Sequence, residues 1–362
     1  MSSLILSAFV SVAVGTVRPI IGVLSVPIED GCVTLAQQHG VARGGGATSC
    51  FHTLYTKWIE SAGARVVPLR YDAPLSEIDA LVGSINGILF TGGETHITDI
   101  HSTYMNTARH LLAHSVNASE AGETLPVWGV RQMLLLWSTV LYDKQQQAPQ
   151  CSTHSILTPP PPPHLPQTCM GMQTLSILIA EDPSVLLTDA FDSESLMLPL
   201  DLTAAASSSR LLGAKSGIPA SILADLTQRN VTTNLHHDGV APEAFQENAK
   251  LAAFFTVVST NKDRKGRVFV STIEGKTAPV FGAQWHPERP QFEWAIAGAR
   301  KDPINHSIQA VAAMQYMSNF FVAQARLNER AFATPAEEAA ALIYNWQPVG
   351  TSSYQAFLFN PK

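Results

Sequence analysis

The sequence is poor in charged residues, in cysteine and in long apolar runs, and each shortage excludes a class of protein. Only 14% of the 362 residues are charged and the formal net charge is −6, so no overall positive field exists to attract nucleic acid. An acidic substrate would have to be held by a few local Arg or Lys side chains. Four cysteines are too few, at this length, to form a disulfide scaffold. The hydrophobic fraction of 46% is typical of a globular protein with a large core.

The N-terminal apolar stretch, Leu4–Gly15, is too short to cross a bilayer. It resembles the core of a signal peptide and ends in small residues, although no Lys or Arg precedes it. We therefore expect residues 1–17 to be a signal peptide. The protein would enter the secretory pathway and reach a vacuole, a lysosome or the cell exterior, and no other segment would span a membrane. Cys32 and Cys50 could then form a disulfide; the alternative is two free thiols.

After Pro19, short apolar runs that suit buried strands alternate with segments of helical periodicity. The expected strands are Ile20–Ser25, Arg65–Leu69, Ile85–Phe90, Leu125–Gly129 and a β pair formed by Arg267–Ile273 and Pro279–Trp285. Helices are expected from an N-cap at Thr48 or Ser49 to a stop at Gly63, and over Ile308–Phe321. This alternation predicts an α/β fold of three layers, with a mostly parallel central sheet and helices on both faces. Ligands of such folds bind at the carboxyl ends of the strands.

The run TCMGMQ, residues 168–173, has the form of a nucleophile elbow. In such an elbow a reactive side chain, here Cys169, lies on a tight turn between a strand and a helix, and a glycine allows the backbones to approach closely. The apolar segment that follows predicts a helix, whose N-terminus would stabilise a thiolate. The alternative is a buried structural cysteine in a helix.

A second run, GAQWHPE at residues 282–288, places His286 just beyond a predicted strand, with Glu288 two residues further on. Residues two apart at a strand end can share one side of the sheet. His286 could therefore act as the base for Cys169, with Glu288 holding its imidazole in the productive tautomer. A histidine alone would indicate little, but this run downstream of an elbow cysteine is much more specific.

These two motifs resemble those of the class I glutamine-amidotransferase-like superfamily. The surrounding sequence is similar to the γ-glutamyl hydrolase family within it. The similar segments are Arg18–Ser25, Trp58–Asp72, Ile85–Gly93, Leu125–Gly129, Thr168–Ala180, Phe281–Glu288 and Glu337–Trp346. The resemblance implies a single domain over residues 18–362, without a cofactor. It also implies hydrolysis of γ-glutamyl bonds, above all in folate poly-γ-glutamates, which would be the small-molecule partner. Monomer and homodimer both stay open.

The resemblance also implies residue roles. Cys169 corresponds to the nucleophile, His286 to its base and Glu288 to the third member of the triad. The backbone N–H groups of Gly93 and Met170 would form the oxyanion hole. Gly92, Gly93 and His236 would contact the substrate, although the adjacent His237 is an alternative to His236. Two other functions remain: a glutaminase module serving a synthetase, and an impaired homologue that only binds its ligand.

Four further histidines, His96, His101, His110 and His114, lie close together in the sequence. We expect no metal site there, because the segment looks irregular and offers no matching carboxylate or cysteine.

One stretch, Val130–Gln167, has no counterpart in the resemblance, where Gly129 would run directly into Thr168. It is 38 residues long, becomes rich in Gln and carries five consecutive prolines, Pro159–Pro163. Every valine codon begins with GT and glutamine can be encoded by CAG, so the stretch is consistent with a short intron read through in frame. A retained intron or a gene-model error is the favoured interpretation, and a true insertion is the alternative. Either would disturb the elbow and leave the stretch poorly ordered.

Overall fold

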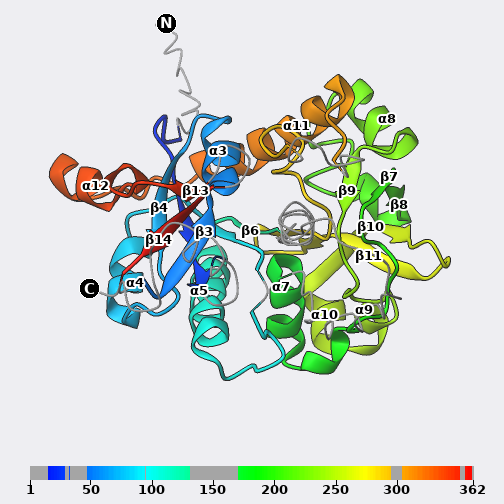
Figure 1. Cartoon of the computed structure of the whole chain (residues 1–362), viewed down its shortest axis with the longest axis horizontal. Coiled ribbons are helices and arrows are strands. Elements are labelled where there is room, and N and C mark those ends of the chain that lie inside the picture. Colours follow the sequence, from blue (N-terminus) through cyan, green and yellow to red (C-terminus); the bar gives the residue numbers. More distant parts are fainter. Residues whose placement is uncertain are drawn as a thin grey trace, which may run out of the picture.

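An eight-stranded sheet forms the centre of the molecule, with the strand order β4–β1–β5–β6–β12–β11–β10–β8 (Figure 1). The computed structural model describes residues 15–28, 32, 47–93, 95–130, 170–294, 304–350 and 355–360. Five neighbouring strands are parallel: β4 (Arg65–Leu69), β1 (Ile20–Leu24), β5 (Gly87–Phe90), β6 (Val127–Gly129) and β12 (Val280–Ala283). The rest are antiparallel: β11 (Val268–Gly275), β10 (Phe255–Lys262) and β8 (Asp201–Leu202). The predicted, mostly parallel sheet is confirmed.

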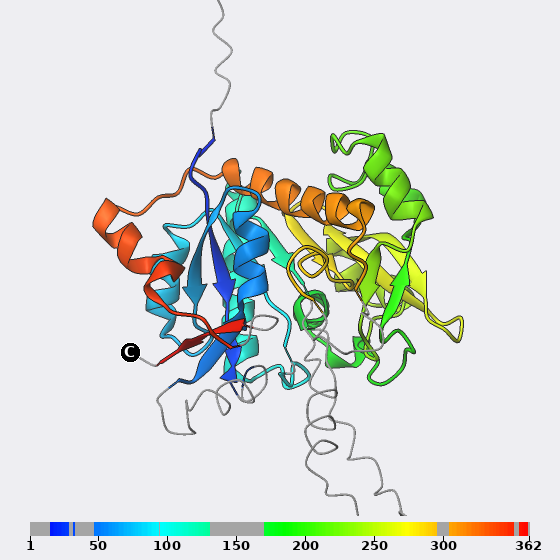
Figure 2. The ribbon, with the colours of Figure 1, turned by 45° about the horizontal axis from the view of Figure 1, so that its top comes forward.

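Each parallel strand is apolar on both sides, because both faces of the sheet are covered. In β1, for example, Ile20 and Leu24 join one hydrophobic cluster, whereas Ile21 and Val23 join the other. The first cluster includes side chains of α4 (Leu75–Val82), α5 (Thr103–Glu120), α7 (Met170–Ala180) and α10 (Ala249–Phe254). The second includes α3 (Thr53–Glu60), α8 (Ala220–Gln228) and α11 (Ile308–Arg326), and Figure 2 shows α11 lying along the sheet between α3 and α8. The three-layer prediction is therefore confirmed.

A second, four-stranded sheet lies beside the first, in the order β13 (Val349–Gly350), β14 (Gln355–Phe359), β3 (Ser49–His52) and β2 (Val26–Pro27). The predicted helix start at Thr48 or Ser49 is wrong, because Ser49–His52 pairs with β14 from the end of the chain. The helix begins at Thr53, with His52 as N-cap, and its C-cap is Ser61 rather than Gly63. Gly63 follows with a φ of +80°, which glycine adopts readily.

The remaining elements are short. They are β7 (Leu196–Leu198), which pairs with β9 (Thr232–Asn234), the helices α9 (Ala244–Glu247) and α12 (Pro335–Ala341), and the 3₁₀ turns η1 (Pro183–Val185), η2 (Ala204–Ser208) and η3 (Ile343–Asn345). Among the described helices, none is long and apolar enough to cross a membrane.

A disulfide joins Cys32 to Cys50, with a Cα–Cα distance of 6.4 Å. Cys50 lies in β3, where its backbone pairs with Leu358 of β14. Of the two alternatives that the sequence left open, the structure therefore has the disulfide. Cys151 and Cys169 lie outside the described residues.

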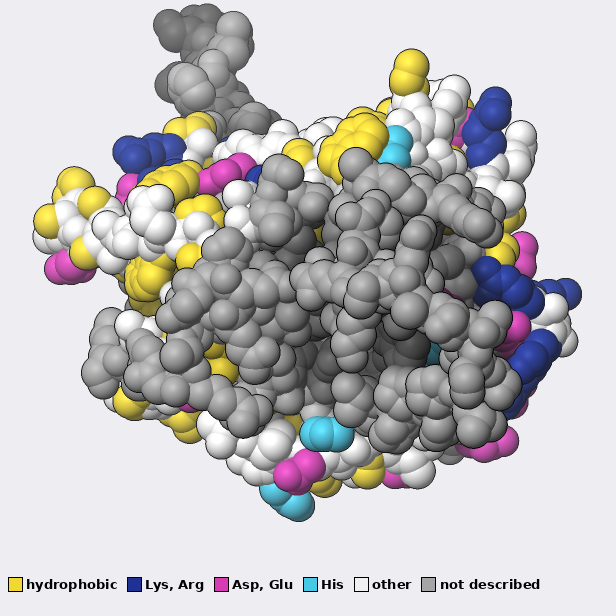
Figure 3. Space-filling model, in the orientation of Figure 1, with side chains coloured by type: hydrophobic (Ala, Val, Ile, Leu, Met, Phe, Trp, Pro, Cys, Tyr) yellow, Lys and Arg dark blue, Asp and Glu magenta, His cyan; other side chains and the backbone are white. Residues whose placement is uncertain are grey.

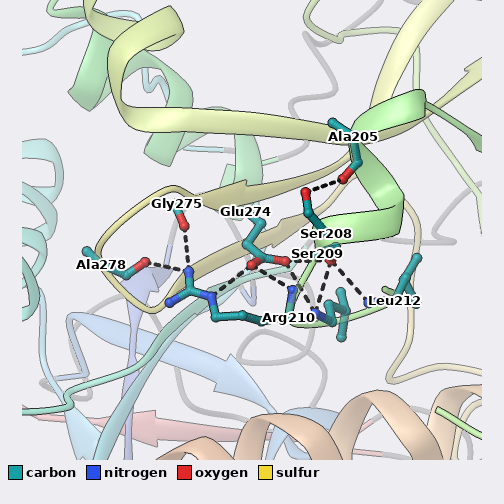
Figure 4. A network of polar contacts seen from close by, with 9 residues as sticks. Ala205, Ser208, Ser209, Arg210, Leu212, Glu274, Gly275 and Ala278 are labelled. Carbon is teal, nitrogen blue, oxygen red and sulfur yellow. Dashed lines mark hydrogen bonds and ion pairs between the residues drawn. The ribbon is translucent and has the colours of Figure 1, made fainter. Parts of the chain in front are cut away.

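A buried carboxylate fastens the loop after η2 to strand β11 (Figure 4). Glu274 accepts hydrogen bonds from the Ser209 hydroxyl at 2.6 Å and from the Arg210 backbone N–H at 2.9 Å. The Arg210 guanidinium closes the network, donating to Glu274 at 2.8 Å and to the Ala278 carbonyl at 2.9 Å. Because both partners of this ion pair make several further hydrogen bonds, the buried charge is compensated.

The expectation that the four neighbouring histidines lie in an irregular segment is wrong for two of them. His110 and His114 lie one turn apart on α5, and the carboxylate of Asp79 on α4 faces both. His96 and His101 lie in the turns before α5. Asp79 was overlooked because it belongs to another helix, 31 residues before His110 in the sequence.

Candidate active site

Several of the predicted site residues that the structure describes lie at the carboxyl ends of neighbouring parallel strands, in the region of β5, β6 and β12. Gly92 and Gly93 follow β5, Val130 follows β6, and His286 follows β12. Because the carboxyl ends of parallel strands meet at one edge of the sheet, these segments lie together. The N-terminus of α7 packs on the same strands (Figure 1).

The start of α7 approaches the end of β6 so closely that only glycine fits. A Cβ atom on Gly171 would lie 2.2 Å from the Val130 carbonyl oxygen and 2.7 Å from that of Phe90. The Gly171 N–H donates to the Val130 carbonyl at 3.0 Å, and the Val130 N–H donates to the Phe90 carbonyl at 3.0 Å. A Cβ on Gly129 would likewise meet the Gly171 backbone at 2.6 Å. This close approach is the physical reason for the glycine in the elbow motif.

Cys169, the predicted nucleophile, lies outside the described residues, but Met170 directly after it is described and buried. Met170 lies against Gly93, since a Cβ on Gly93 would be 3.0 Å from the Met170 sulfur. The Thr95 N–H also points at this sulfur, at 3.2 Å. The two residues named for the oxyanion hole are therefore brought together. The Gly92 N–H donates to the Tyr55 hydroxyl at 3.0 Å.

The histidine and glutamate of the second motif form a buried pair. Nδ1 of His286 lies 2.8 Å from Oε1 of Glu288, and both side chains are at most 1% exposed. The His286 backbone N–H donates to the Thr233 carbonyl of β9 at 3.0 Å, which fixes the loop after β12. A carboxylate only accepts, so this contact requires a proton on Nδ1 and leaves Nε2 as the basic nitrogen.

Of the two adjacent histidines, His236 is the one buried in the interior. Its Nδ1 lies 3.0 Å from the Asp238 carbonyl, and its ring packs edge-on against Phe269 with centroids 4.5 Å apart. His237 is half-buried, and its Nδ1 lies 3.0 Å from the Phe191 carbonyl. The structure thus gives the two rings different surroundings.

Comparison with known proteins places the chain in a family. The family model of peptidase C26 matches residues 19–142. The chain is 31% identical to a γ-glutamyl hydrolase of Rattus norvegicus, over 96% of this chain and 91% of the relative. It is 33% identical to the γ-glutamyl hydrolase of Homo sapiens, over 84% of this chain and 79% of the relative. The chain belongs to the γ-glutamyl hydrolase family.

This membership confirms the family that the two motifs indicated, and it makes the chain a hydrolase of the peptidase C26 class. The plant protein γ-glutamyl hydrolase 1 of Arabidopsis thaliana is more distant, at 26% identity over 91% of this chain and 78% of its own. Among solved structures, a putative GMP synthase component from Thermoplasma acidophilum has a TM-score of 0.36 and 12% identity, covering 85% of this chain and 94% of that chain.

Three polar residues beside the predicted site residues could not be found from the sequence: Gln173, Arg289 and Glu293. Gln173 of α7 donates to the Asp238 carbonyl at 3.0 Å, the same oxygen that His236 faces, and its Nε2 lies 3.4 Å from Gln284 Oε1. It thereby ties the elbow helix to both histidine segments. Gln173 belongs to the elbow motif, but nothing in the sequence indicates its partners.

The other two are Arg289 and Glu293, which are buried beside the His286–Glu288 pair. Arg289 Nη1 lies 2.7 Å from Glu293 Oε1, and Arg289 Nε lies 3.1 Å from Nδ1 of His286. Nδ1 carries a proton toward Glu288 or a lone pair toward Arg289, so the two contacts belong to different tautomers. We assign the Glu288 contact, which is shorter and joins a donor to a carboxylate. The only signal in the sequence was the position of Arg289 directly after the motif.

Proposed function

We propose that the protein hydrolyses the γ-glutamyl bonds of folate poly-γ-glutamates through a thioester on Cys169, with His286 as base and Glu288 as its orienting partner. The observation that carries this proposal is the buried His286–Glu288 pair at the sheet edge where α7 begins. Family membership supports the same reaction class.

In this mechanism Cys169 directly precedes the first residue of α7, so its thiolate would be stabilised by the helix N-terminus. Nε2 of His286 accepts the thiol proton, and the sulfur attacks the side-chain carbonyl of the γ-linked glutamate. The N–H groups of Gly93 and Met170 stabilise the oxyanion. Gly92 contacts the substrate without donating a hydrogen bond to it, since its N–H already donates to the Tyr55 hydroxyl. His286 then protonates the leaving amine, and water cleaves the thioester.

Basic side chains of one hairpin support a polyanionic substrate. Lys262, Arg264, Lys265 and Arg267 are all exposed in the hairpin between β10 and β11. Figure 3 shows Lys and Arg side chains at the edge of the molecule where Figure 1 places this hairpin. The Arg267 guanidinium lies over the Phe191 ring at 5.3 Å, and that ring lies 6.3 Å from the ring of His236. A poly-γ-glutamate tail carries one carboxylate per residue and would be attracted to this end of the site.

We also propose that the mature protein works in the secretory pathway, in a vacuole or lysosome or outside the cell. The apolar stretch Leu4–Gly15 and the Cys32–Cys50 disulfide support this, because disulfides persist mainly in oxidising compartments. Sequencing the N-terminus of the protein from its native source should find it near Thr16–Pro19. Recovery of an intact Met1 from the cytosol would end this part of the proposal.

The nucleophile is best tested in a form that joins Gly129 directly to Thr168. Cys151 is then absent and Cys32 pairs with Cys50, so Cys169 would be the one remaining thiol. Alkylation of one thiol per chain should abolish glutamate release from a folyl triglutamate. Cys169→Ala should lower kcat/KM by at least about a thousandfold. Near-parental activity of this variant would remove Cys169 as nucleophile, and ligand binding without turnover in the joined parent would favour the impaired-homologue alternative.

A further inference from the structure

Helices α4 and α5 cover the same side of the sheet (Figure 1). Three of their side chains converge on one another. His110 and His114 of α5 each place Nε2 near Oδ1 of Asp79 on α4, at 2.6 and 2.8 Å. The two Nε2 atoms are 3.3 Å apart, and one donor atom from each side chain lies within 4.8 Å of the others. None of the three belongs to the proposed active site.

The local geometry follows from the helix. Residues four apart lie on one face of an α-helix, so the two imidazoles project together toward α4. Their Nε2–Nε2 distance of 3.3 Å matches the edge of a tetrahedron with metal–nitrogen bonds of about 2.0–2.1 Å, which is roughly 3.3 Å. The Asp79 oxygen lies closer than such an edge, but its side chain is 49% exposed and can withdraw by rotation.

We propose that Asp79, His110 and His114 form a binding site for one divalent transition-metal ion, with Zn²⁺ as the ion of choice. Two imidazole nitrogens and one carboxylate oxygen suit Zn²⁺, whereas Mg²⁺ and Ca²⁺ prefer oxygen ligands throughout. The fourth position would hold water. The ion would link α4 to α5 and stabilise the folded state, because it binds that state in preference to the unfolded chain.

In the structure, both imidazoles are hydrogen-bonded to one oxygen of the Asp79 carboxylate. Without metal, each Nε2–H can donate to the same carboxylate oxygen, and this is the competing description of the cluster. The two descriptions differ in whether a metal ion displaces those protons.

The test is a titration of metal-free full-length protein with Zn²⁺ against a chromophoric chelator. The parent should bind one more Zn²⁺ ion than His110→Ala or His114→Ala. Asp79→Asn should lower the affinity for that ion at least about tenfold, because loss of even an indirect metal partner commonly costs this much. His101→Ala, which removes an exposed histidine in the turn before α5, is the matched control and should bind like the parent. Equal binding by the parent and His110→Ala would overturn the proposal.

Two further readouts separate this site from the active site. Co²⁺ in the proposed site should give a nitrogen–oxygen ligand-field spectrum without a thiolate charge-transfer band, and that spectrum should be lost in His114→Ala but kept in Cys169→Ala. Zn²⁺ should raise the Tm of the parent and of His101→Ala, but not of His110→Ala. A spectrum that disappears in Cys169→Ala instead would assign the ion to the active site and reject the cluster. Neither readout depends on γ-glutamyl hydrolysis, so the proposed function can fail independently.

Discussion

In the proposed mechanism, the protonation state of the buried His286 imidazole decides whether the site can work. Nδ1 of His286 faces both a carboxylate, which can only accept a hydrogen bond, and a guanidinium, which can only donate one. Arg289 in turn lies between Glu288, at 3.7 Å, and Glu293, at 2.7 Å, so that one cation is shared by two buried carboxylates. Because the Arg289 cation lies close to both carboxylates, neither would be an isolated buried charge.

The relative cost of removing His286 and Glu288 tests these roles. In the form joining Gly129 to Thr168, His286→Ala should lower kcat by several orders of magnitude, because the base is lost. Glu288→Gln should cost less, since the amide still holds the ring but no longer enforces the tautomer. Steady-state kinetics on a folyl triglutamate measure both. Glu243→Gln, an exposed glutamate on the surface, is the control and should match the parent. A larger loss in Glu288→Gln than in His286→Ala would contradict the assignment.

Single residues were predictable from the sequence where the chemistry is local. His286 and Glu288 lie in one short motif, and their buried contact was expected from a spacing of two. The Asp79–His110–His114 cluster was not predictable, because its carboxylate comes from a different helix. The partners of Gln173 likewise come from distant segments. Those of Arg289 lie within four residues of it, but they depend on how the loop after β12 folds.

At the scale of elements, continuous apolar runs in the sequence predicted the strands well. The sequence did not reveal which distant segments pair with one another. Strand β4 matches its predicted bounds, and α11 begins at the predicted Ile308 but extends five residues beyond Phe321. The spacing of Phe51, Leu54 and Tyr55 predicts a helix that includes Ser49–His52. What makes Ser49–His52 a strand is the ladder with β14, about 300 residues away in sequence, which local periodicity cannot reveal.

At the junction between β6 and α7, Val130 occupies a position that another residue would take if the stretch Val130–Gln167 were absent. The Val130 carbonyl accepts the Gly171 N–H at 3.0 Å. In a chain that joined Gly129 to Thr168, the Thr168 carbonyl would stand three residues before Gly171, the spacing of a β-turn hydrogen bond. We infer that Thr168 would take the place of Val130. The rest of the stretch lies outside the described residues, so its poor order stays a prediction.

Deleting the stretch at two registers tests this junction. Removal of 130–167 should raise kcat/KM above that of the full chain, because the turn then has its natural length. Removal of 131–167, which leaves Val130 as one extra residue, is the matched control. It should be slower by roughly a hundredfold, the cost of misplacing a reacting group by about 1 Å. Limited proteolysis should cut only the full chain within 131–167. Full activity of the long chain, with the 38 codons present in every mature transcript, would show a true insertion.

At the scale of the whole molecule, the net charge of −6 would oppose the binding of the proposed polyanionic substrate, so we expect the local basic hairpin to matter. Asp263 shapes the hairpin turn by accepting the backbone N–H groups of Lys265 and Arg267 at 2.8 Å and of Asp192 at 2.9 Å. Burial alone would raise the pKa of this carboxyl, but the three hydrogen bonds outweigh it and the pKa is lowered. The turn therefore stays fixed at neutral and mildly acidic pH.

Neutralising the two lysines of this hairpin should weaken the binding of long substrates. Arg264 and Arg267 are engaged with Asp192 and the Ala190 carbonyl, so Lys262→Gln with Lys265→Gln removes charge with the least structural change. At low ionic strength the double variant should raise KM for a folyl pentaglutamate about threefold and leave kcat unchanged, because only attraction to the tail is lost. The increase should shrink for a diglutamate and vanish at high salt, where exposed charges are screened.

Lys215→Gln, which neutralises an exposed lysine outside the hairpin, is the control for net charge. A rise in KM independent of tail length and salt would mean that the hairpin does not contact the glutamate tail.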